Sequence, residues 1–209
     1  MSKKAIIISI IAVLIVAGIV VGGLYLFKYK PGDAAYDPTG PAKPGTVLTA
    51  DTSKDFNATT LLSKDTVKSA LGTAAANLEG PNNLGFVHAK DGGESQTAVY
   101  PFVSGGTIDN SYNVTNAFSF EVYQHTDKAS VDALIAVKPS TAVDITSLGD
   151  KAWFIENKTA GAPTTSYSLL VVSGTKHYTF RISQPANAAT FTLDSAKSAL
   201  TTIASSLTY

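Results

Sequence analysis

The chain has no cysteine, a single arginine, a single tryptophan and only three histidines among its 209 residues. Without cysteine, the fold cannot depend on disulfides, thiolate-bound metals or a lipid-modified N-terminal cysteine. The G-x-S-x-G, H-E-x-x-H and P-loop motifs are also absent, so nucleophilic, zinc and phosphate chemistry lack their usual starting points. We therefore predict no catalytic, cofactor-binding or metal-binding residue, and a protein that is not an enzyme.

Charged residues are sparse and unevenly divided. Basic residues flank the N-terminal apolar run, whereas the part after Lys30 contains all sixteen acidic residues and only twelve basic ones, Arg181 among them. Nucleic acids and anionic lipid surfaces attract clustered Lys and Arg rather than net negative charge. The composition therefore disfavours a nucleic-acid partner.

One long apolar run does occur, from Ala5 to Phe27. At about 1.5 Å per residue it reaches ~35 Å, which is enough to cross a hydrocarbon core of ~30 Å. It is longer than the core of a cleavable signal and ends at Lys28 rather than at an A-x-A-like site, so we predict an uncleaved transmembrane anchor in contact with membrane lipid. Gly18 and Gly22 have the G-x-x-x-G spacing that lets two such helices pack closely, and a homodimer through them is one possibility.

The anchor sets the predicted organisation. Residues 1–4 form a short cytoplasmic tail, 5–27 a transmembrane helix, 28–57 a flexible linker rich in Pro and Gly, and 58–209 an extracytoplasmic domain. The orientation rests on the polar domain that follows, because the basic residues on the two sides of the anchor are almost equal in number. We expect a single-pass protein of the cell membrane.

Periodic patterns predict the elements of the large domain. Helical spacing predicts helices over 64–76, after a cap at Thr126 or Asp127 up to Pro139, and from Thr192 or Asp194 to Leu207. Alternation and β-branched or aromatic residues predict strands at 85–88, 97–100, 117–123, 153–155, 167–172 and 178–182. The expected fold class is α+β: an N-terminal transmembrane helix, a flexible Pro/Gly tether, and one domain whose mainly antiparallel sheet is covered by about three helices.

Several short motifs carry a resemblance. The motifs are residues 61–63 with Val67, Ala70, Leu71 and Gly72, residues 147–153, residues 170–172 before Gly174, and the final amphipathic helix. Together they resemble bacterial membrane-anchored or lipoprotein-type extracytoplasmic domains, which are similar in layout to the PsbP-like α+β sandwich. The chain lacks the lipobox cysteine and the paired cysteines common in such lipoproteins. The resemblance implies a fold rather than an activity.

The residues that offer chemistry all have a structural interpretation beside the functional one. His88, His125 and His177 lack the spacing of a helical metal site, and we interpret them as surface or hairpin histidines. Asp109, Asn110, Asn116 and Asp127 offer oxygen ligands for calcium, but match no calcium loop, and solvated loops and helix capping are their structural interpretation. Asp150 is either an acid or part of a tight turn after Gly149, and the turn is favoured. Tyrosines suit an aromatic groove, yet strands favour them anyway; they are Tyr100, Tyr112, Tyr123, Tyr167 and Tyr178.

These observations favour a non-catalytic binding or interaction module of the bacterial cell envelope, anchored by residues 5–27. Its partner is an envelope protein or a small ligand of unknown identity. An envelope-acting enzyme with scattered catalytic residues is the first alternative, and it predicts a cleft with converging carboxylates and perturbed pKa values. A filament-type surface subunit is the second.

Overall fold

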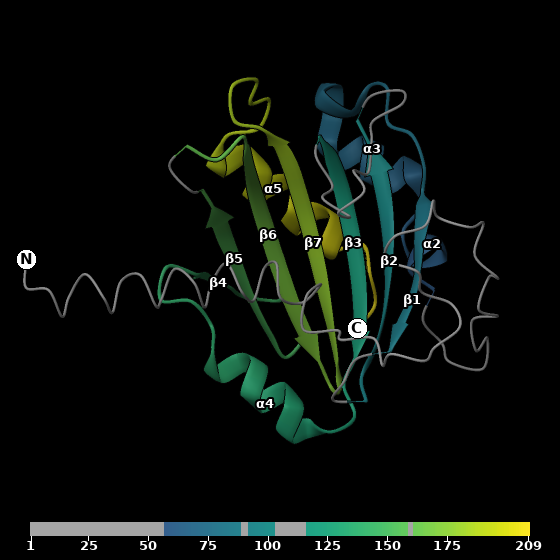
Figure 1. Ribbon diagram of the computed structural model, residues 1–209, viewed down its shortest axis with the longest axis vertical. Helices are drawn as coiled ribbons and strands as arrows, with labels where there is room; N and C mark the ends of the chain where they lie inside the picture. The colour runs from purple at the N-terminus through teal and green to yellow at the C-terminus, as the bar shows by residue number, and fades with distance from the viewer. Residues whose placement is uncertain (1–56, 89–91, 103–115, 159–160) are drawn as a thin grey trace, which may run out of the picture.

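The computed structural model describes residues 57–88, 92–102, 116–158 and 161–209, which form a seven-stranded sheet with short helices (Figure 1). The strands are β1 (Asn82–His88), β2 (Glu94–Pro101), β3 (Ala117–Gln124), β4 (Val143–Ile145), β5 (Lys151–Asn157), β6 (Thr164–Ser173) and β7 (Lys176–Pro185). The helices are α2 (Ala58–Leu61), α3 (Lys64–Leu71), the 3-10 helix η1 (Gly72–Ala75), α4 (Lys128–Ala136) and α5 (Leu193–Ala204).

Every neighbouring pair in the sheet is antiparallel, and the spatial order is β1-β2-β3-β7-β6-β5-β4. After β3 the chain passes through α4 to the far edge and then returns strand by strand, so that β7 pairs with β3. This closing step brings residues 117–124 beside residues 176–185, which are distant in the sequence. At the β3–β7 junction, residues far apart in the sequence therefore become direct neighbours.

One face of the sheet carries the main hydrophobic core. Alternate residues of β3 and β7 point to it, including the fully buried Phe118, Phe120 and Phe180. Helix α5 covers this face behind the sheet in Figure 1, contacting β6, β7 and α3. Burying a side chain of this size stabilises the fold by roughly 1.5–3 kcal/mol. The alternation predicted for 117–123 is thus confirmed, because its apolar residues reach the core.

The three longer helices begin at side-chain caps. Ser63, Asp127 and Thr192 accept hydrogen bonds from the backbone N–H groups of Thr66, Ser130 and Ser195, respectively. Such caps satisfy donors that the first turn of a helix leaves without intrahelical partners. The predicted starts of these helices are confirmed. The first helix ends earlier than predicted, because Gly72 adopts φ +63° and the chain continues as η1.

The predicted fold class is wrong. The described chain is dominated by a seven-stranded antiparallel sheet with few helices, rather than a sheet layered under about three helices. The strands are longer than the local patterns indicated, with β6 and β7 reaching ten residues each, and β4 and the four-residue α2 were not predicted. A strand gains its stability from cross-strand neighbours, which a local pattern does not contain.

The same prediction included a transmembrane helix. None of the helices within the described ranges is long and apolar enough to cross a membrane. The predicted tail 1–4, the run 5–27 with Gly18 and Gly22, and the linker up to residue 56 lie outside the described residues.

Candidate functional site

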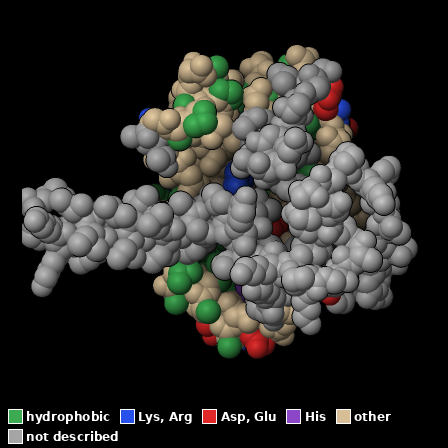
Figure 2. Space-filling view, in the orientation of Figure 1, with side chains coloured by type: hydrophobic (Ala, Val, Ile, Leu, Met, Phe, Trp, Pro, Cys, Tyr) green, Lys and Arg blue, Asp and Glu red, His purple; other side chains and the backbone are tan. Residues whose placement is uncertain are grey.

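The second face of the sheet differs from the core face in composition. Helix α4 covers its outer part, toward β5, where Val131, Trp153 and Val172 form a small hydrophobic cluster. Over β2, β3 and β7 most of the side chains on this face are polar, although the buried Val99 and Ala117 also belong to it. We call the polar part the polar face; its members are Ser95, Thr97, Ser119, Glu121, Thr179 and Arg181. Figure 2 views this side and shows basic and acidic side chains near the middle of the sheet. The polar face is partly exposed: Ser95 is buried, whereas the other five members are half-buried.

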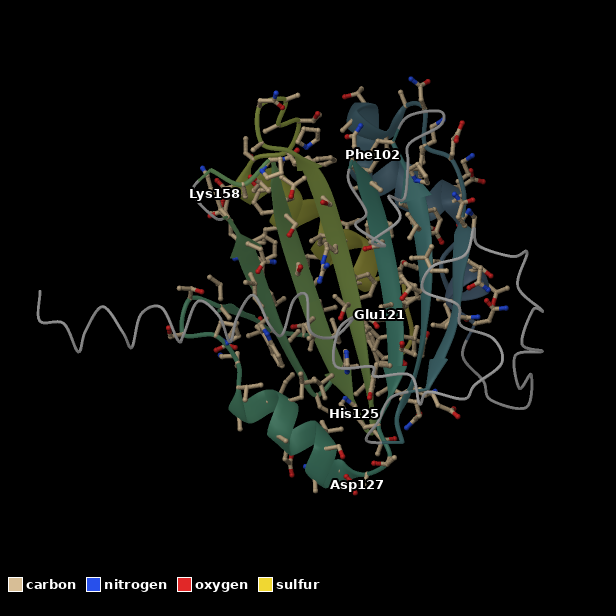
Figure 3. All side chains as sticks on the ribbon, in the orientation of Figure 1. Phe102, Glu121, His125, Asp127 and Lys158 are labelled. Atoms are coloured by element: carbon tan, nitrogen blue, oxygen red, sulfur yellow. The ribbon has the colours of Figure 1, made fainter. Side chains whose placement is uncertain are left out.

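A carboxylate and a guanidinium lie at the centre of the polar face. Glu121 on β3 is opposite Thr179 on β7, and Ser119 is opposite Arg181, so Glu121 and Arg181 are diagonal neighbours on one face. Diagonal neighbours of this kind are within reach of each other when their side chains are long. Both side chains are half-buried. Figure 3 shows Glu121 midway along β3.

The two groups influence each other's protonation. Burial raises the pKa of Glu121, while the positive charge of Arg181 and a hydrogen bond from Ser95 lower it. Burial lowers the pKa of Arg181, and the charge of Glu121 raises it. Desolvation is the largest cause in both cases, because a charge loses hydration when it leaves water. Each group therefore offsets part of the other's desolvation cost.

The Arg181 side chain is oriented by neighbours on β5 and β6. Its Nε donates to Oγ of Ser168 at 3.3 Å, and Nδ2 of Asn157 donates to the same oxygen at 3.2 Å. Arginine has five N–H donors, and the four on its two Nη atoms form a fork that suits a carboxylate or phosphate. No described residue accepts a hydrogen bond from these four donors. The guanidinium is thus held toward β6 by its Nε.

A second cluster lies at one end of the same face. Nε2 of His125 is 2.8 Å from Nδ1 of His177, which is hydrogen-bond distance. The ring of Tyr123 stacks on His177, with centroids 4.9 Å apart, and lies 4.7 Å from His125. Tyr123 is directly opposite His177 in the β3–β7 register. We call Tyr123, His125 and His177 the imidazole cluster.

The environment keeps one imidazole neutral. Burial, followed by the proximity of His125, lowers the pKa of His177 to about 3. At the start of α4, hydrogen bonds from Ser130 lower the pKa of the exposed Asp127, and the charge of His125 adds to this effect. At neutral pH, His177 therefore keeps the lone pair of its unprotonated ring nitrogen.

Backbone contacts hold the imidazole cluster in place. The His125 N–H donates to the Thr175 carbonyl at 2.8 Å. The Gln124 side-chain amide donates to the His125 carbonyl at 2.8 Å and to Thr175 Oγ1 at 2.8 Å. Gly93 lies so close to the Tyr123 ring that a Cβ atom at that position would overlap it. The end of β3 is thus fastened to the β6–β7 turn.

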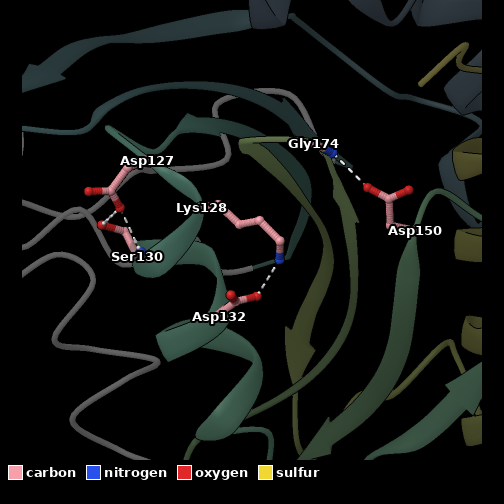
Figure 4. Close-up of polar contacts among 6 residues, drawn as sticks. All are labelled: Asp127, Lys128, Ser130, Asp132, Asp150 and Gly174. Carbon is pink, nitrogen blue, oxygen red and sulfur yellow. Dashed lines mark hydrogen bonds and ion pairs between the residues drawn. The ribbon is translucent and has the colours of Figure 1, made fainter.

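The residues considered for calcium are not assembled into a site. Asp127 caps α4 through Ser130, which is drawn in Figure 4. Asp109 and Asn110 lie outside the described residues, and Asn116 adopts φ 53° just before β3. Across the described ranges, no group of three or more His, Cys, Asp or Glu residues is placed to hold a metal ion. The capping interpretation of Asp127 is confirmed.

Two further candidates have structural roles. Oδ2 of Asp150 accepts a hydrogen bond from the Gly174 N–H at 2.7 Å, which connects the turn before β5 to the β6–β7 turn (Figure 4). The tyrosines do not share one face: Tyr100, Tyr167 and Tyr178 belong to the core, whereas Tyr123 is on the polar side. Tyr112 and the side chain of His88 are outside the described part. The aromatic groove is therefore not formed by the tyrosines that the structure describes.

Sequence reasoning missed both clusters. His125 and His177 are 52 positions apart, and Glu121 and Arg181 are 60 apart, so neither pair has a local signature. Arg181 alternates with Phe180 and Ile182 as any solvent-facing strand residue does. Both clusters depend on the β3–β7 pairing, whose register places Tyr123 opposite His177. Only a prediction of that pairing could have found them.

Comparisons with known proteins found no matching family model, curated protein or solved structure. The resemblance to lipoprotein-type domains and the PsbP-like layout has no support from these comparisons and stays a prediction.

Proposed function

We propose that this protein is a non-catalytic, membrane-anchored binding module that acts outside the cytoplasmic membrane and binds its ligand on the polar face. The anchor in this proposal is the apolar run 5–27, on the sequence argument alone. The observation that carries the binding role is the placement of Glu121 beside Arg181 on a partly exposed sheet face.

The charges favour a particular class of ligand. A simple anion that approaches the Arg181 fork also meets the carboxylate of Glu121, which repels it. A ligand with both a carboxylate and an ammonium group satisfies both side chains, as an amino acid or the end of a peptide does. The hydroxyls of Ser95, Ser119 and Thr179 add hydrogen-bonding capacity around the pair. The proposed ligand is therefore a small zwitterionic molecule or a peptide.

Binding to this face is tested on the purified full chain. Amino acids, dipeptides and neutral saccharides are titrated by calorimetry into the wild type and into Glu121→Gln and Arg181→Lys. We expect zwitterions to bind, and each substitution to weaken binding at least about tenfold, because a lysine lacks the planar fork. Glu156→Gln is the matched control, since Glu156 is an exposed strand glutamate on β5. Equal binding by all variants, or no binding by any probe, would refute the proposal.

An envelope-acting enzyme remains the alternative, and the raised pKa of Glu121 favours it, because a protonated carboxyl can act as a general acid. A glycosidase of the usual type needs a second carboxyl nearby. On β2, β3 and β7, Glu121 is the only carboxylate of the polar side. If the wild type hydrolysed cell-wall fragments and Glu121→Gln abolished this activity, the polar face would be a catalytic site rather than a binding site.

The proposed location has a separate test. Proximity labelling from the C-terminus in intact cells should mark neighbours outside the cytoplasm, and the protein should stay with vesicles after a carbonate wash. Cytosolic neighbours would overturn the orientation. Release by carbonate would overturn the anchor while leaving the ligand experiment unaffected.

A further inference from the structure

The hydrogen bond between the two rings of the imidazole cluster survives only while one ring nitrogen stays unprotonated. Nε2 of His125 and Nδ1 of His177 are 2.8 Å apart, so one of these nitrogens donates a hydrogen and the other accepts it through its lone pair. A proton added to the accepting nitrogen removes that lone pair and leaves two N–H groups facing each other. Protonation of both rings therefore breaks the bond and replaces it with repulsion between like charges.

The ring-to-ring bond lies where the chain leaves the sheet to form α4. His125 directly follows β3, and Asp127, two residues later, caps the first turn of α4. Figure 3 shows His125 and Asp127 close to each other at the end of β3, where α4 begins. His177 belongs to β7, beside β3. The bond therefore holds the start of α4 against the sheet, together with the bond from the His125 N–H to the Thr175 carbonyl.

Helix α4 buries little apolar surface against the sheet. Val131 is its only buried residue, whereas α5 has five. Val131 shares a hydrophobic cluster with Val172, which is directly opposite His177 in the β6–β7 register, and Leu134 and Ile135 are only partly buried there. Segments with few buried apolar side chains open locally at a low free-energy cost. The attachment of α4 therefore depends strongly on the contacts at its start.

We propose that the imidazole cluster is a pH-sensitive latch, in which protonation of both rings releases α4 from the sheet. In the released form the His177 ring meets water and has an ordinary pKa near 6.5. In the closed form burial, followed by the proximity of His125, lowers this pKa to about 3. The released form therefore gains population relative to the closed form by up to about tenfold per pH unit as pH falls from about 6.5 to about 3. This latch does not depend on the proposed ligand.

Other charged and titratable groups surround the imidazole cluster and have to be separated from it. They are Tyr123 and Glu121 on the same face of β3, Lys151 on the same face of β5, Asp127 and Lys128 at the start of α4, and Asp150 at the β6–β7 turn. A free aspartate or glutamate is mostly ionised above about pH 5. Burial raises the pKa of Glu121, so this carboxyl needs its own control. The comparison is therefore made between pH 5 and pH 7.

The test is native-state hydrogen exchange of the purified full chain at pH 7 and pH 5, expressed as protection factors that remove the intrinsic pH dependence of exchange. We expect the protection of α4 to fall at least about tenfold between these pH values and to stay well below that of α5. Small additions of urea should hardly change exchange in α4, because a local opening exposes little surface, and should quicken it in α5. His177→Gln should lower the protection of α4 at pH 7 and make it nearly independent of pH.

Three control variants should keep the pH dependence of the wild type. Glu121→Gln removes the buried carboxyl, Asp127→Asn removes a charge while asparagine still caps the helix, and His88→Gln removes the third histidine of the chain. Loss of the pH dependence in any of them would assign the effect to that group.

The wild type alone keeps the proposal testable if His177→Gln fails to fold, which circular dichroism shows. Equal protection of α4 between pH 7 and pH 5, or the same protection and urea dependence in α4 and α5, would overturn the latch. A folded His177→Gln variant with the full pH dependence of the wild type would overturn it as well.

Discussion

The side chain of Gln184 bonds the backbone of Phe191 in both directions. Its Nε2 donates to the Phe191 carbonyl at 2.8 Å, and its Oε1 accepts from the Phe191 N–H at 2.8 Å. Oε1 also accepts from the Thr190 N–H at 2.8 Å. Gln184 is only 1% exposed, so these contacts replace the water that the backbone of residues 190–191 would otherwise need. They position the chain one residue before the Thr192 cap of α5.

Gln184→Leu tests this role. The substitution keeps the approximate size of the side chain but leaves buried N–H and C=O groups of residues 190–191 without partners. We expect the free energy of unfolding to fall by about 1–3 kcal/mol, measured by urea denaturation. Asn187→Leu, at an exposed position in the same connection, should change it by less than about 0.5 kcal/mol. Equal effects would show that Gln184 does not secure α5.

Tyr100→Phe tests the attachment of the α2–α3 turn to the sheet. The Tyr100 hydroxyl donates to the Leu62 carbonyl at 2.7 Å in a buried contact, and burial raises the pKa of Tyr100 to about 12. Removing the hydroxyl should cost about 1–2 kcal/mol of stability, because the carbonyl stays buried without its donor. Hydrogen exchange should quicken in 58–71 and stay unchanged in β6. If hydrogen exchange quickened equally in 58–71 and in β6, the Tyr100–Leu62 contact would not have a local role.

Acid should destabilise the protein through His177. The pKa of His177 is about 3 in the folded state and near 6.5 in the unfolded chain, so the unfolded state binds more protons between these values. Stability should therefore fall as pH falls from about 6.5 to about 3, with a slope of up to about 1.4 kcal/mol per pH unit. Urea denaturation across this range measures the slope.

His177→Gln is the matching variant for the acid effect. It should be less stable than the wild type at pH 7 but lose less stability on acidification, because glutamine does not titrate. An identical pH dependence in the two proteins would assign the acid sensitivity to other groups.

A double-mutant cycle measures the interaction between Glu121 and Arg181. Arg181→Gln should raise the pKa of Glu121 further, since the guanidinium lowers it in the wild type. We expect a coupling free energy of about 1 kcal/mol from unfolding measurements on the two single variants and the double variant. The exposed pair Lys128–Asp132, 2.7 Å apart on α4, should give about 0.5 kcal/mol or less (Figure 4). A smaller coupling for Glu121 and Arg181 than for this pair would contradict the argument from desolvation.

Gly149→Ala tests a close approach of two backbone segments. Gly149 has φ +53°, and a Cβ atom there would overlap the Val172 carbonyl oxygen. Gly161 has φ +78° with no atom within 4 Å of its missing Cβ. Gly161→Ala should therefore cost about 1 kcal/mol from the backbone conformation alone, and Gly149→Ala about 1–3 kcal/mol more. Calorimetric melting temperatures of the two variants decide the comparison.

The local elements were largely predictable from the sequence, whereas the fold class was not. The Asp127 and Thr192 caps and the alternation of Phe118, Phe120 and Val122 are short-range features, and the structure confirms them. The edge strand β4 is only three residues long, too short for a local pattern to predict, and forms through pairing with β5. Its existence depends on a neighbour that no local pattern contains.

In the candidate site, too, some features follow from the local sequence and others from the tertiary structure alone. Alternation along β3 by itself placed Ser119, Glu121 and Tyr123 on the face opposite the apolar residues, because successive side chains of a strand point to opposite sides. Only the tertiary structure decided that β7 would lie beside β3, which brought Arg181 to Glu121 and His177 to His125. The physical reason is that strand order follows from the burial and hydrogen bonding of the whole sheet, while the direction of a side chain follows from the geometry of its own backbone.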